Sequence, residues 1–313
     1  MSGELLWWLN LLVGVGIFTL LATSLNLING HAGMFHLGHH GFWALGAYAT
    51  AWWTIRLDGE LSGPVLYGTS LLLSTGVAAV GGLAVGLPCL RLRGDYLAIA
   101  TLAFGEVVRI LIQNSDKGFL GGSQGVRLPR VFGEFEGEAA KLEFRALSLA
   151  LVATLCVLAI WAISNFIRSG HGRRLLAVAQ DETAAGLMGI DPTRPRVLAF
   201  VIGAAVAGLA GGVHAHFEGS LAPQEFEFMQ TVKMFLIVVL GGMGSLSGCV
   251  VGAFLVVGTE RLLARAGGAI ADWWQVIFPM VLAIMIVVRP QGIFGRRELS
   301  DWFRALRRRR AAP

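Results

Sequence analysis

Residues 146–167 read ALSLALVATLCVLAIWAISNFI, and none of these side chains carries a charge. An α-helix rises about 1.5 Å per residue, so roughly 20 apolar residues are enough to cross the hydrocarbon layer of a bilayer. Of all 313 residues, 55% are hydrophobic and 14% are charged, whereas an ordinary soluble domain has about 25% charged residues. The stretch therefore predicts a transmembrane helix, and the composition predicts an all-α integral membrane protein.

Further apolar segments recur along the chain and predict a polytopic helical bundle of about eight or nine spans. The 42 glycines allow helices to approach closely, and also to break or to re-enter the bundle. We expect residues 1–295 to form one transmembrane domain, followed by a basic tail at 296–313. The other expected segments are 5–28, 41–55, 64–90, 96–112, 197–217, 232–240, 248–263 and 273–288.

Basic residues are distributed unevenly between the loops, and this predicts how the chain is oriented. Arginines are concentrated at Arg91 and Arg93, in the loop 168–196 and in the tail. Alternate threading of the spans places these regions on one side, and their excess of positive charge identifies that side as cytoplasmic. The C-terminus is then cytoplasmic, the loop 115–145 is external, and the membrane is a bacterial or archaeal plasma (inner) membrane. Four consecutive arginines at 307–310 are typical of an anchor to membrane lipids rather than of a nucleic-acid-binding patch.

Two charged residues lie inside one expected span. Glu106 and Arg109 are three residues apart, so on a helix they lie on one face and neutralise each other. Such an intramembrane ion pair either stabilises the bundle or takes part in transport, and the sequence leaves both roles open.

The loop 168–196 mixes polar and apolar residues with the spacing of a short helix. Gly189 is suited to end that helix, and Pro192 prevents its continuation. A short helix between two spans predicts a docking site for a soluble partner. The alternative is an amphipathic helix that touches only lipid.

The stretch HLGHH, residues 36–40, has the His-x-x-His-His spacing of a metal-binding motif. A metal-dependent membrane enzyme needs several such motifs, and the remaining histidines, at 31, 171, 214 and 216, do not repeat the spacing. We therefore predict no metal site and no catalytic residue, although a haem held by two histidines stays open. The chain has no Gly-Lys dipeptide and hence no phosphate-binding loop. We expect no bound cofactor, so any ATP must be bound by separate subunits.

A weak internal correspondence relates this region to the stretch GGMGSLSG at 241–248. Gly38 and Gly46 match Gly244 and Gly252 at a common offset of 206 residues. Transporters often contain repeats whose broken helices line the binding site. In a chain so rich in glycine, the match is compatible with a repeat and also with chance.

Five blocks, in order, resemble those of a known family: the membrane permease subunit of branched-chain amino acid ABC importers, of the LivM type. The blocks are LNLINGHAGMFHLGHHGFWALGAYATA, LRLRGDYLAIATLAFGEVVRIL, GGSQGV, GRRLLAVAQDETAAGLMGIDPTRPRVLAFVIGAAVAGLAGG and VVLGGMGSLSGCVVGAFLV. The resemblance implies a coupling helix that docks on an ATPase subunit, with its signature at Glu182, Ala184, Ala185 and Gly189.

Within HLGHH, the resemblance gives His39 a counterpart in the family. His36 stands where a serine is usual, and His40 where a small residue is usual. Polar groups and glycines inside apolar segments are candidates to line the translocation path, because broken helices direct backbone groups at a zwitterionic solute. These candidates are Asn26, Asn29, Gly33, His36, Gly38, His39, Thr101, Gly241, Gly242, Gly244 and Ser245.

The resemblance implies a transport subunit and not an enzyme. Such a permease moves branched-chain or other neutral, hydrophobic amino acids across the inner membrane by alternating access. Its implied partners are a second permease subunit in a heterodimer, two cytoplasmic ATP-binding subunits, and a periplasmic or lipid-anchored solute-binding protein that contacts the loop 115–145. One alternative is a related permease for urea or short amides. Another is a proton-coupled secondary transporter that uses Glu106, Arg109 and the histidines.

Overall fold

The computed structural model describes residues 2–89, 92, 94–116, 120–129, 131, 138–267, 269–288, 292–293 and 295, so the expected tail at 296–313 lies outside the described residues. The only strands among them are β1 (Val126–Arg127) and β2 (Ser220–Leu221), which pair antiparallel. The helices are α1 (Ser2–Asn26), α2 (His39–Arg56), α3 (Gly63–Cys89), α4 (Asp95–Gln113), α6 (Glu138–Arg168), α7 (Gly170–Gln180), α8 (Glu182–Leu187), α9 (Thr193–Glu218), α10 (Phe228–Gly241), α11 (Leu246–Ala266) and α12 (Ala269–Val288), with the short η1 (Leu27–His31), η2 (Gly122–Gln124) and η3 (Pro223–Phe226).

Five helical stretches among the described residues are long and apolar enough to cross a membrane: α1 with η1, α3, α6, α9 and α11. The remaining expected segments fall on α2, α4, α10 and α12, so every segment predicted from the sequence is helical. The fold is an all-α multi-pass membrane fold, as predicted. One boundary differs, because α6 begins at Glu138, inside the loop expected at 115–145. The turn EAAKLEFR at 138–145 is rich in good helix formers.

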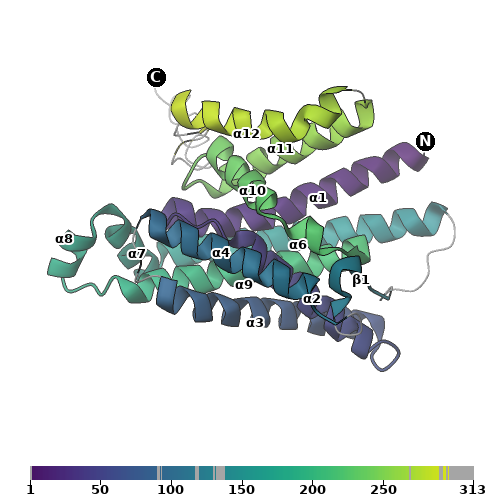
Figure 1. Ribbon diagram of the computed structural model, residues 1–313, viewed down its shortest axis with the longest axis horizontal. Coiled ribbons are helices and arrows are strands. Elements are labelled where there is room, and N and C mark those ends of the chain that lie inside the picture. Colours follow the sequence, from purple (N-terminus) through teal and green to yellow (C-terminus); the bar gives the residue numbers. More distant parts are fainter. Residues whose placement is uncertain are drawn as a thin grey trace, which may run out of the picture.

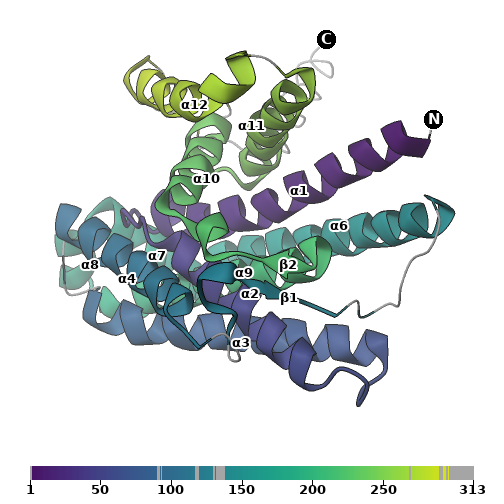
Figure 2. The ribbon, with the colours of Figure 1, turned by 45° about the vertical axis from the view of Figure 1, so that its right-hand side comes forward.

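Helix α1 lies at the centre of the bundle. It runs between a layer of α10, α11 and α12 and a layer that contains α2, α3, α4 and α9 (Figure 1 and Figure 2). It contacts α6, α9, α10 and α11, and Leu20, Leu21 and Leu25 are fully buried. Residues 19–26 of α1 are all buried, and an apolar helix that is covered on all sides forms the interior of a bundle.

Helices α2, α3 and α9 pack closely through small residues. A Cβ atom at Gly46 of α2 would collide with the backbone of Gly208 in α9, and a Cβ at Gly208 would collide with Ala78 in α3. Gly82 of α3 and Ala204 of α9 meet in the same way. Because small residues let helix backbones approach closely in a membrane, these contacts fix the position of α2 in the layer.

Two of the helical passages are interrupted at glycines. Helix α1 continues into the π-helix η1, and residues 32–38 form no helix before α2 begins. Between α10 and α11 the chain turns at Gly242 and Gly244, whose φ angles are 116° and 93°, and Gly33 has φ 65°. Residues other than glycine rarely adopt such positive φ angles. The predicted broken helices are therefore present at both places.

The two stretches related by the offset of 206 residues both lead into a helix. Gly38 precedes α2, and Gly244 precedes Ser245 at the start of α11. Gly46 and Gly252 each lie against the backbone of a neighbouring helix, α9 and α10 respectively. The backbone differs at the first pair, since φ is −94° at Gly38 and 93° at Gly244. The correspondence is thus limited to two helix starts, each followed by a glycine at a close contact.

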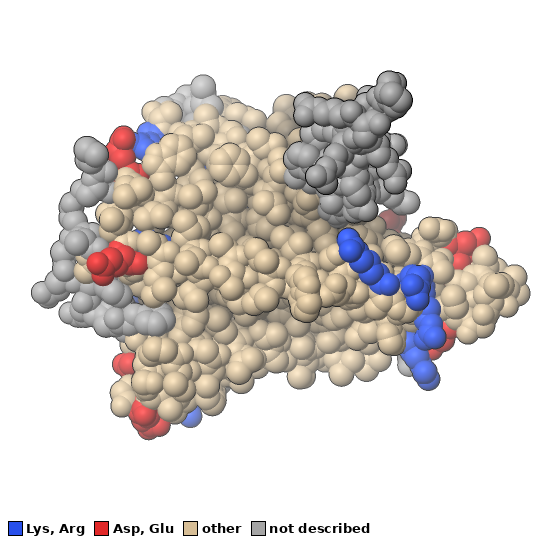
Figure 3. Space-filling view, turned by 180° about the vertical axis from the view of Figure 1, so that it is seen from behind, with Lys and Arg blue, Asp and Glu red and all other residues tan. Residues whose placement is uncertain are grey.

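Charged side chains are concentrated at the two ends of the bundle. Helices α7 and α8 lie at one end, and the N-terminus of α1 and β1 lie at the other (Figure 1). On the face seen in Figure 3, a broad band without charged side chains separates the two ends. Leu72, Val157 and Trp161 are exposed apolar side chains on the spanning helices α3 and α6. An uncharged band between polar ends is the surface that a bilayer requires.

Candidate functional site

Asn26, the last residue of α1, joins the two helix breaks. Its Nδ2 donates to the carbonyl oxygen of Ser245 (3.0 Å), and its Oδ1 accepts from the backbone N–H of Gly244 (2.9 Å). A Cβ atom at Gly30 would collide with Oδ1 of Asn26 and with the backbone nitrogen of Gly244. One amide side chain therefore holds the stretch GGMGSLSG against the end of α1. The end of α1 and the stretch GGMGSLSG were both predicted to line the translocation path. The structure brings the two stretches together.

Replacing Asn26 by leucine tests this junction. Two bonds to backbone groups are lost, and the N–H of Gly244 loses its acceptor, so we expect Asn26→Leu to destabilise the protein by about 2 kcal/mol. The measurement is the thermal unfolding midpoint of the purified protein in detergent. Asn165→Leu is the control, since Asn165 is exposed on α6. Equal midpoints for the two variants would contradict the role given to Asn26.

The connection between η1 and α2 is fixed by side chains from two helices. The side chain of Asn29 pairs with the backbone of His36, donating from Nδ2 to the carbonyl oxygen (3.2 Å) and accepting at Oδ1 from the N–H (3.3 Å). Oγ1 of Thr101 in α4 accepts from the backbone N–H of Leu37 (3.1 Å). Gly38 packs directly against the carbonyl group of Thr101, where a Cβ atom would collide. Asn29, Gly38 and Thr101 thus position this segment.

Most of the candidate path residues are enclosed by protein in this conformation. Gly33 and Gly244 instead line a pocket of about 310 Å³ at the α7 end of the bundle, beside Arg168. Gly241 lies where α10 crosses α11, with its Cα against the carbonyl group of Gly248. The structure gives the enclosed residues a role in holding the breaks, and their place on a path stays a prediction. The polar candidates with an exposed fraction of 0% are Asn26, His36, His39, Thr101 and Ser245.

The three histidines of HLGHH contact different parts of the bundle. Helix α2 begins at His39, so His36 lies outside the helix, although its ring meets that of His39 edge-on with centroids 5.6 Å apart. Nε2 of His39 is hydrogen-bonded to Oγ of Ser24 in α1 (2.8 Å), and Nδ1 of His40 to Oγ1 of Thr231 in α10 (2.8 Å). Within the described part of the chain, no three His, Cys, Asp or Glu side chains are grouped so that they could hold a metal ion. For His39 and His40, the structure shows helix-to-helix hydrogen bonds.

The His36 ring is packed among aromatic rings. It stacks on Phe42, with ring centroids 5.7 Å apart, and meets Phe200 edge-on at 5.0 Å. Neither of its ring nitrogens has a hydrogen-bond partner among the described residues. A buried polar atom without a partner costs about 1–3 kcal/mol, so this imidazole weakens the core that it fills.

An apolar side chain of similar size is therefore expected to be tolerated at this position. We expect His36→Leu to leave the free energy of unfolding unchanged or to raise it by about 1 kcal/mol, because it removes two unpaired nitrogens. His39→Leu is the matched control and should destabilise, since it breaks the bond to Ser24. Thermal unfolding of both variants measures the difference. A loss of stability in His36→Leu as large as in His39→Leu would show that the ring nitrogens of His36 do have partners.

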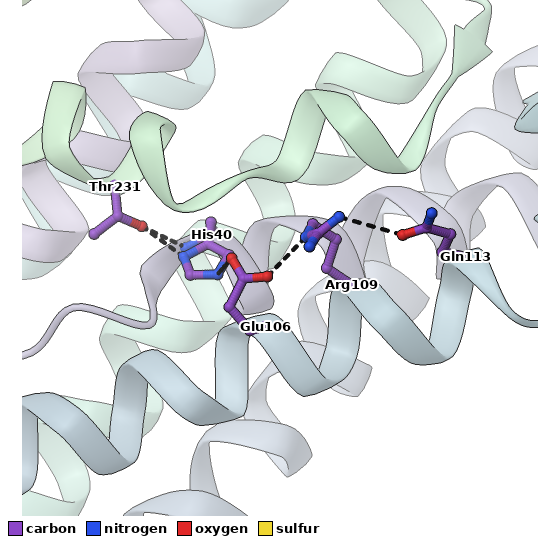
Figure 4. A network of polar contacts seen from close by, with 5 residues as sticks. All are labelled: His40, Glu106, Arg109, Gln113 and Thr231. Carbon is purple, nitrogen blue, oxygen red and sulfur yellow. Dashed lines mark hydrogen bonds and ion pairs between the residues drawn. The ribbon is translucent and has the colours of Figure 1, made fainter. Parts of the chain in front are cut away.

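His40 connects α2 to α4 and α10 through a polar network (Figure 4). Its Nδ1 bonds to Thr231, and its Nε2 lies 3.7 Å from Oε1 of Glu106. Arg109 donates from Nε to Oε2 of Glu106 (2.8 Å) and from Nη1 to Oε1 of Gln113 (3.3 Å). The expected pair of Glu106 and Arg109 is present, and it is linked to one of the histidines.

The small size of Gly105 makes room for this network. A Cβ atom at Gly105 would collide with the ring of His40, the residue that stands where the family usually has a small one. The side chains of Glu106 and Arg109 are 30% and 21% exposed. Because charges inside a membrane are costly unless they are paired, the network favours the role of stabilising the contact between α2, α4 and α10.

A second ion pair inside the bundle was missed by the sequence analysis. Lys233 of α10 is paired with Glu260 of α11, and its ammonium nitrogen lies 4.2 Å from the ring centroid of Phe18 in α1. Lys233 is only 8% exposed. The signal is one lysine in the apolar stretch 228–241 and one glutamate in the stretch 246–266. Charges of opposite sign in consecutive apolar segments indicate such a pair, although the second segment also holds Arg261 and Arg265.

The segment 168–196 contains two short helices, α7 and α8, at one end of the bundle (Figure 1). Asp181 caps α8, accepting from the N–H groups of Thr183 (2.8 Å) and Ala184 (2.9 Å). Gly189 follows α8 with φ 77°. This is the conformation of a glycine that ends a helix, so the expected helix end is present.

Two residues of the coupling signature, Glu182 and Ala185, are held against the rest of the chain, whereas two apolar residues beside the signature are exposed. Glu182 is bonded to Arg196 (3.2 Å), and Ala185 is only 5% exposed. By contrast, Leu187 and Met188 are 85% and 82% exposed. We call these two residues the α8 tip. An exposed apolar pair outside the uncharged band is a candidate contact surface.

Residues 8–288 match the family described as branched-chain amino acid transport system / permease component. The chain belongs to this family. The matched region contains both helix breaks, the network around His40 and the α8 tip. The resemblance recognised in the sequence blocks is therefore confirmed.

Individual relatives agree with the family assignment. The chain is 35% identical over 297 residues to LivM, a permease protein of the high-affinity branched-chain amino acid transport system, in Salmonella typhimurium and in Escherichia coli; both matches cover 88% of this chain and 67% of the relative. It is 28% identical over 292 residues to LivH of Escherichia coli, a permease protein of the system of the same name, and this match covers 90% of this chain and 92% of LivH.

Proposed function

We propose that the chain is the permease subunit of an ATP-driven importer that moves branched-chain or other neutral, hydrophobic amino acids across the inner membrane by alternating access. Family membership and the printed names of the relatives support this proposal. The chain is a transport subunit that binds no cofactor of its own, and ATP is bound and hydrolysed by partner subunits.

The α8 tip is the observation that carries the proposal. Helix α8 forms the outermost part of its end of the bundle (Figure 1). The side chains of Leu187, its last residue, and of Met188, which follows it, are more than four-fifths exposed. A soluble ATPase provides a groove that covers such a pair. ATP binding can change the permease only if the tip fits the two states of the ATPase differently.

The charges around α7 and α8 support a cytoplasmic position for this end. Basic side chains gather there on the face seen in Figure 3, and an excess of Lys and Arg is typical of cytoplasmic loops. The loop 115–145 then lies outside, and the tail 296–313 inside. The basic residues of the segment are Arg168, Arg173, Arg174, Arg194 and Arg196.

The relatives also support a heterodimer. The Escherichia coli system has two named permease proteins, LivM and LivH, and this chain is similar to both of them. We propose that a second, LivH-like permease pairs with this chain, that two ATPases bind at the cytoplasmic side, and that a solute-binding protein docks on the external loop 115–145. Membrane lipids cover the uncharged band.

A physical link connects the α8 tip to the broken helices. Helix α7 contacts η1, and a Cβ atom at Gly33 would lie 3.5 Å from the Cβ of Ala179 in α7. Asn26 then joins η1 to the turn between α10 and α11 through Gly244. A movement of α7 and α8 therefore reaches both breaks, where we propose that the candidate path residues open and close the route.

Chemical cross-linking tests the docking surface. With cysteine introduced by Met188→Cys, a thiol-reactive cross-linker is expected to join the permease to its ATPase, and ATP should change the yield. Glu60→Cys is the control, because Glu60 is exposed at the opposite end of the bundle. Cross-linking from residue 60 but not from residue 188 would contradict both the docking surface and the orientation.

A further inference from the structure

A cavity of about 280 Å³ lies at the end of the bundle opposite α7 and α8, and none of the candidate path residues lines it. Its walls come from α1, α3, α6, α9 and the segment that follows β1. The volume is close to the lower end of the range for ligand pockets, roughly 300 Å³. The lining is largely apolar and includes Leu6, Leu147, Leu151, Val152, Val213 and Phe217.

The cavity is next to the surface that faces lipid. Leu147 lines it and is nevertheless 47% exposed, and Trp161, further along α6, is 64% exposed. On α1, next to the lining residue Leu6, Leu5 and Trp8 are 49% and 45% exposed. Tryptophan is enriched at the level of the lipid headgroups. Both helices extend to this end of the bundle (Figure 2), so the cavity lies beside the surface that lipid would cover.

The charged lining residues leave one net positive charge. Lys141 and Arg145 lie four residues apart on α6, hence on one face, and Glu218 is the one acidic residue among the described residues that line the cavity. Nη1 of Arg145 donates to the carbonyl oxygen of Phe217 (3.1 Å), and its guanidinium carbon lies 4.2 Å from that ring centroid. Arg145 is thus held in the wall. Lys141 lines the cavity and is exposed.

We propose that the cavity binds an anionic glycerophospholipid of the phosphatidylglycerol type. The apolar lining takes part of an acyl chain, and the phosphate lies at Lys141 and Arg145. The site is separate from the transported solute, so it stands independently of the proposed function.

Lipid retention tests the site. The full chain, purified with its partner subunits, is equilibrated with phosphatidylglycerol or phosphatidylcholine, and bound lipid is measured by native mass spectrometry. We expect preferential retention of phosphatidylglycerol. Lys141→Gln should weaken it about fivefold, since one lysine near a lipid phosphate contributes about 1 kcal/mol. Ser148→Phe should abolish retention by filling the cavity, and Ser148→Leu serves if that variant does not fold.

The control is Arg127→Gln, which removes an exposed positive charge at the same end of the bundle but outside the cavity. This variant should retain phosphatidylglycerol like the unchanged protein. Equal retention of the two lipids, or no effect of Lys141→Gln and the Ser148 variants, would overturn the proposal. Displacement of the lipid by free leucine would also overturn it, because the cavity would then be a solute site.

Discussion

Replacing Leu187 and Met188 together by aspartate is expected to abolish transport while the membrane fold stays intact. Both side chains are more than four-fifths exposed, so their replacement disturbs no packing inside the chain. In a docked complex, each apolar contact at the centre of the interface contributes about 2 kcal/mol, and a buried aspartate adds a desolvation cost. Together the changes should weaken binding of the ATPase by about a hundredfold or more.

The readout is co-purification of the ATPase together with ATP-dependent uptake in proteoliposomes. Thr193→Asp is the matched control, because Thr193 is exposed near α8 but outside it and is the first residue of α9, where a negative charge favours the helix. That variant should bind and transport normally. Normal uptake by the double aspartate variant would remove α8 from the coupling surface.

The largest loss of stability is expected from Glu260→Gln. It leaves the ammonium group of Lys233 in the bundle, only 8% exposed, without its carboxylate partner. Breaking a buried ion pair costs about 3–5 kcal/mol, and we expect the lower end, because the side chain of Glu260 is 34% exposed. The thermal unfolding midpoint of the purified protein measures the effect.

A double substitution separates the charge effect from packing. Lys233→Met with Glu260→Leu removes both charges and retains apolar volume, so its stability should return to near that of the unchanged protein. Arg265→Gln is the surface control: it breaks an exposed pair with Glu4, and such pairs contribute about 0–1 kcal/mol. A double variant as unstable as Glu260→Gln would mean that packing, and not the ion pair, stabilises this contact.

The helices were predictable from the sequence because the requirement behind them is local. A span needs about 20 apolar residues in a row, and 146–167 meets this without reference to the rest of the chain. The break at Gly33 and the helix end at Gly189 were also predictable, since positive φ angles are the positions where glycine is needed. The start of α6 at Glu138 was missed because a charged but helix-forming turn resembles a loop in hydropathy.

The side-chain partners were less predictable, since they depend on how the helices pack. Glu106 and Arg109 are one helical turn apart, so their pairing follows from spacing alone. His40 and Thr231 are 191 residues apart, and no periodicity relates them. The three histidines of HLGHH would share one face only on a continuous helix, and α2 begins only at His39. The docking role of the coupling signature stays a prediction, and the exposure of Leu187 and Met188 required the structure.

The central claim is that this chain moves neutral, hydrophobic amino acids with the energy of ATP. The permease, its second permease subunit, the two ATPases and the solute-binding protein are reconstituted in proteoliposomes, and uptake of labelled leucine and labelled urea is measured with ATP inside, with and without a protonophore. We expect uptake of leucine that requires ATP and the binding protein and is insensitive to the protonophore. Uptake of urea but not leucine would support the urea or amide permease, and uptake that continues without ATP and stops with the protonophore would contradict the account.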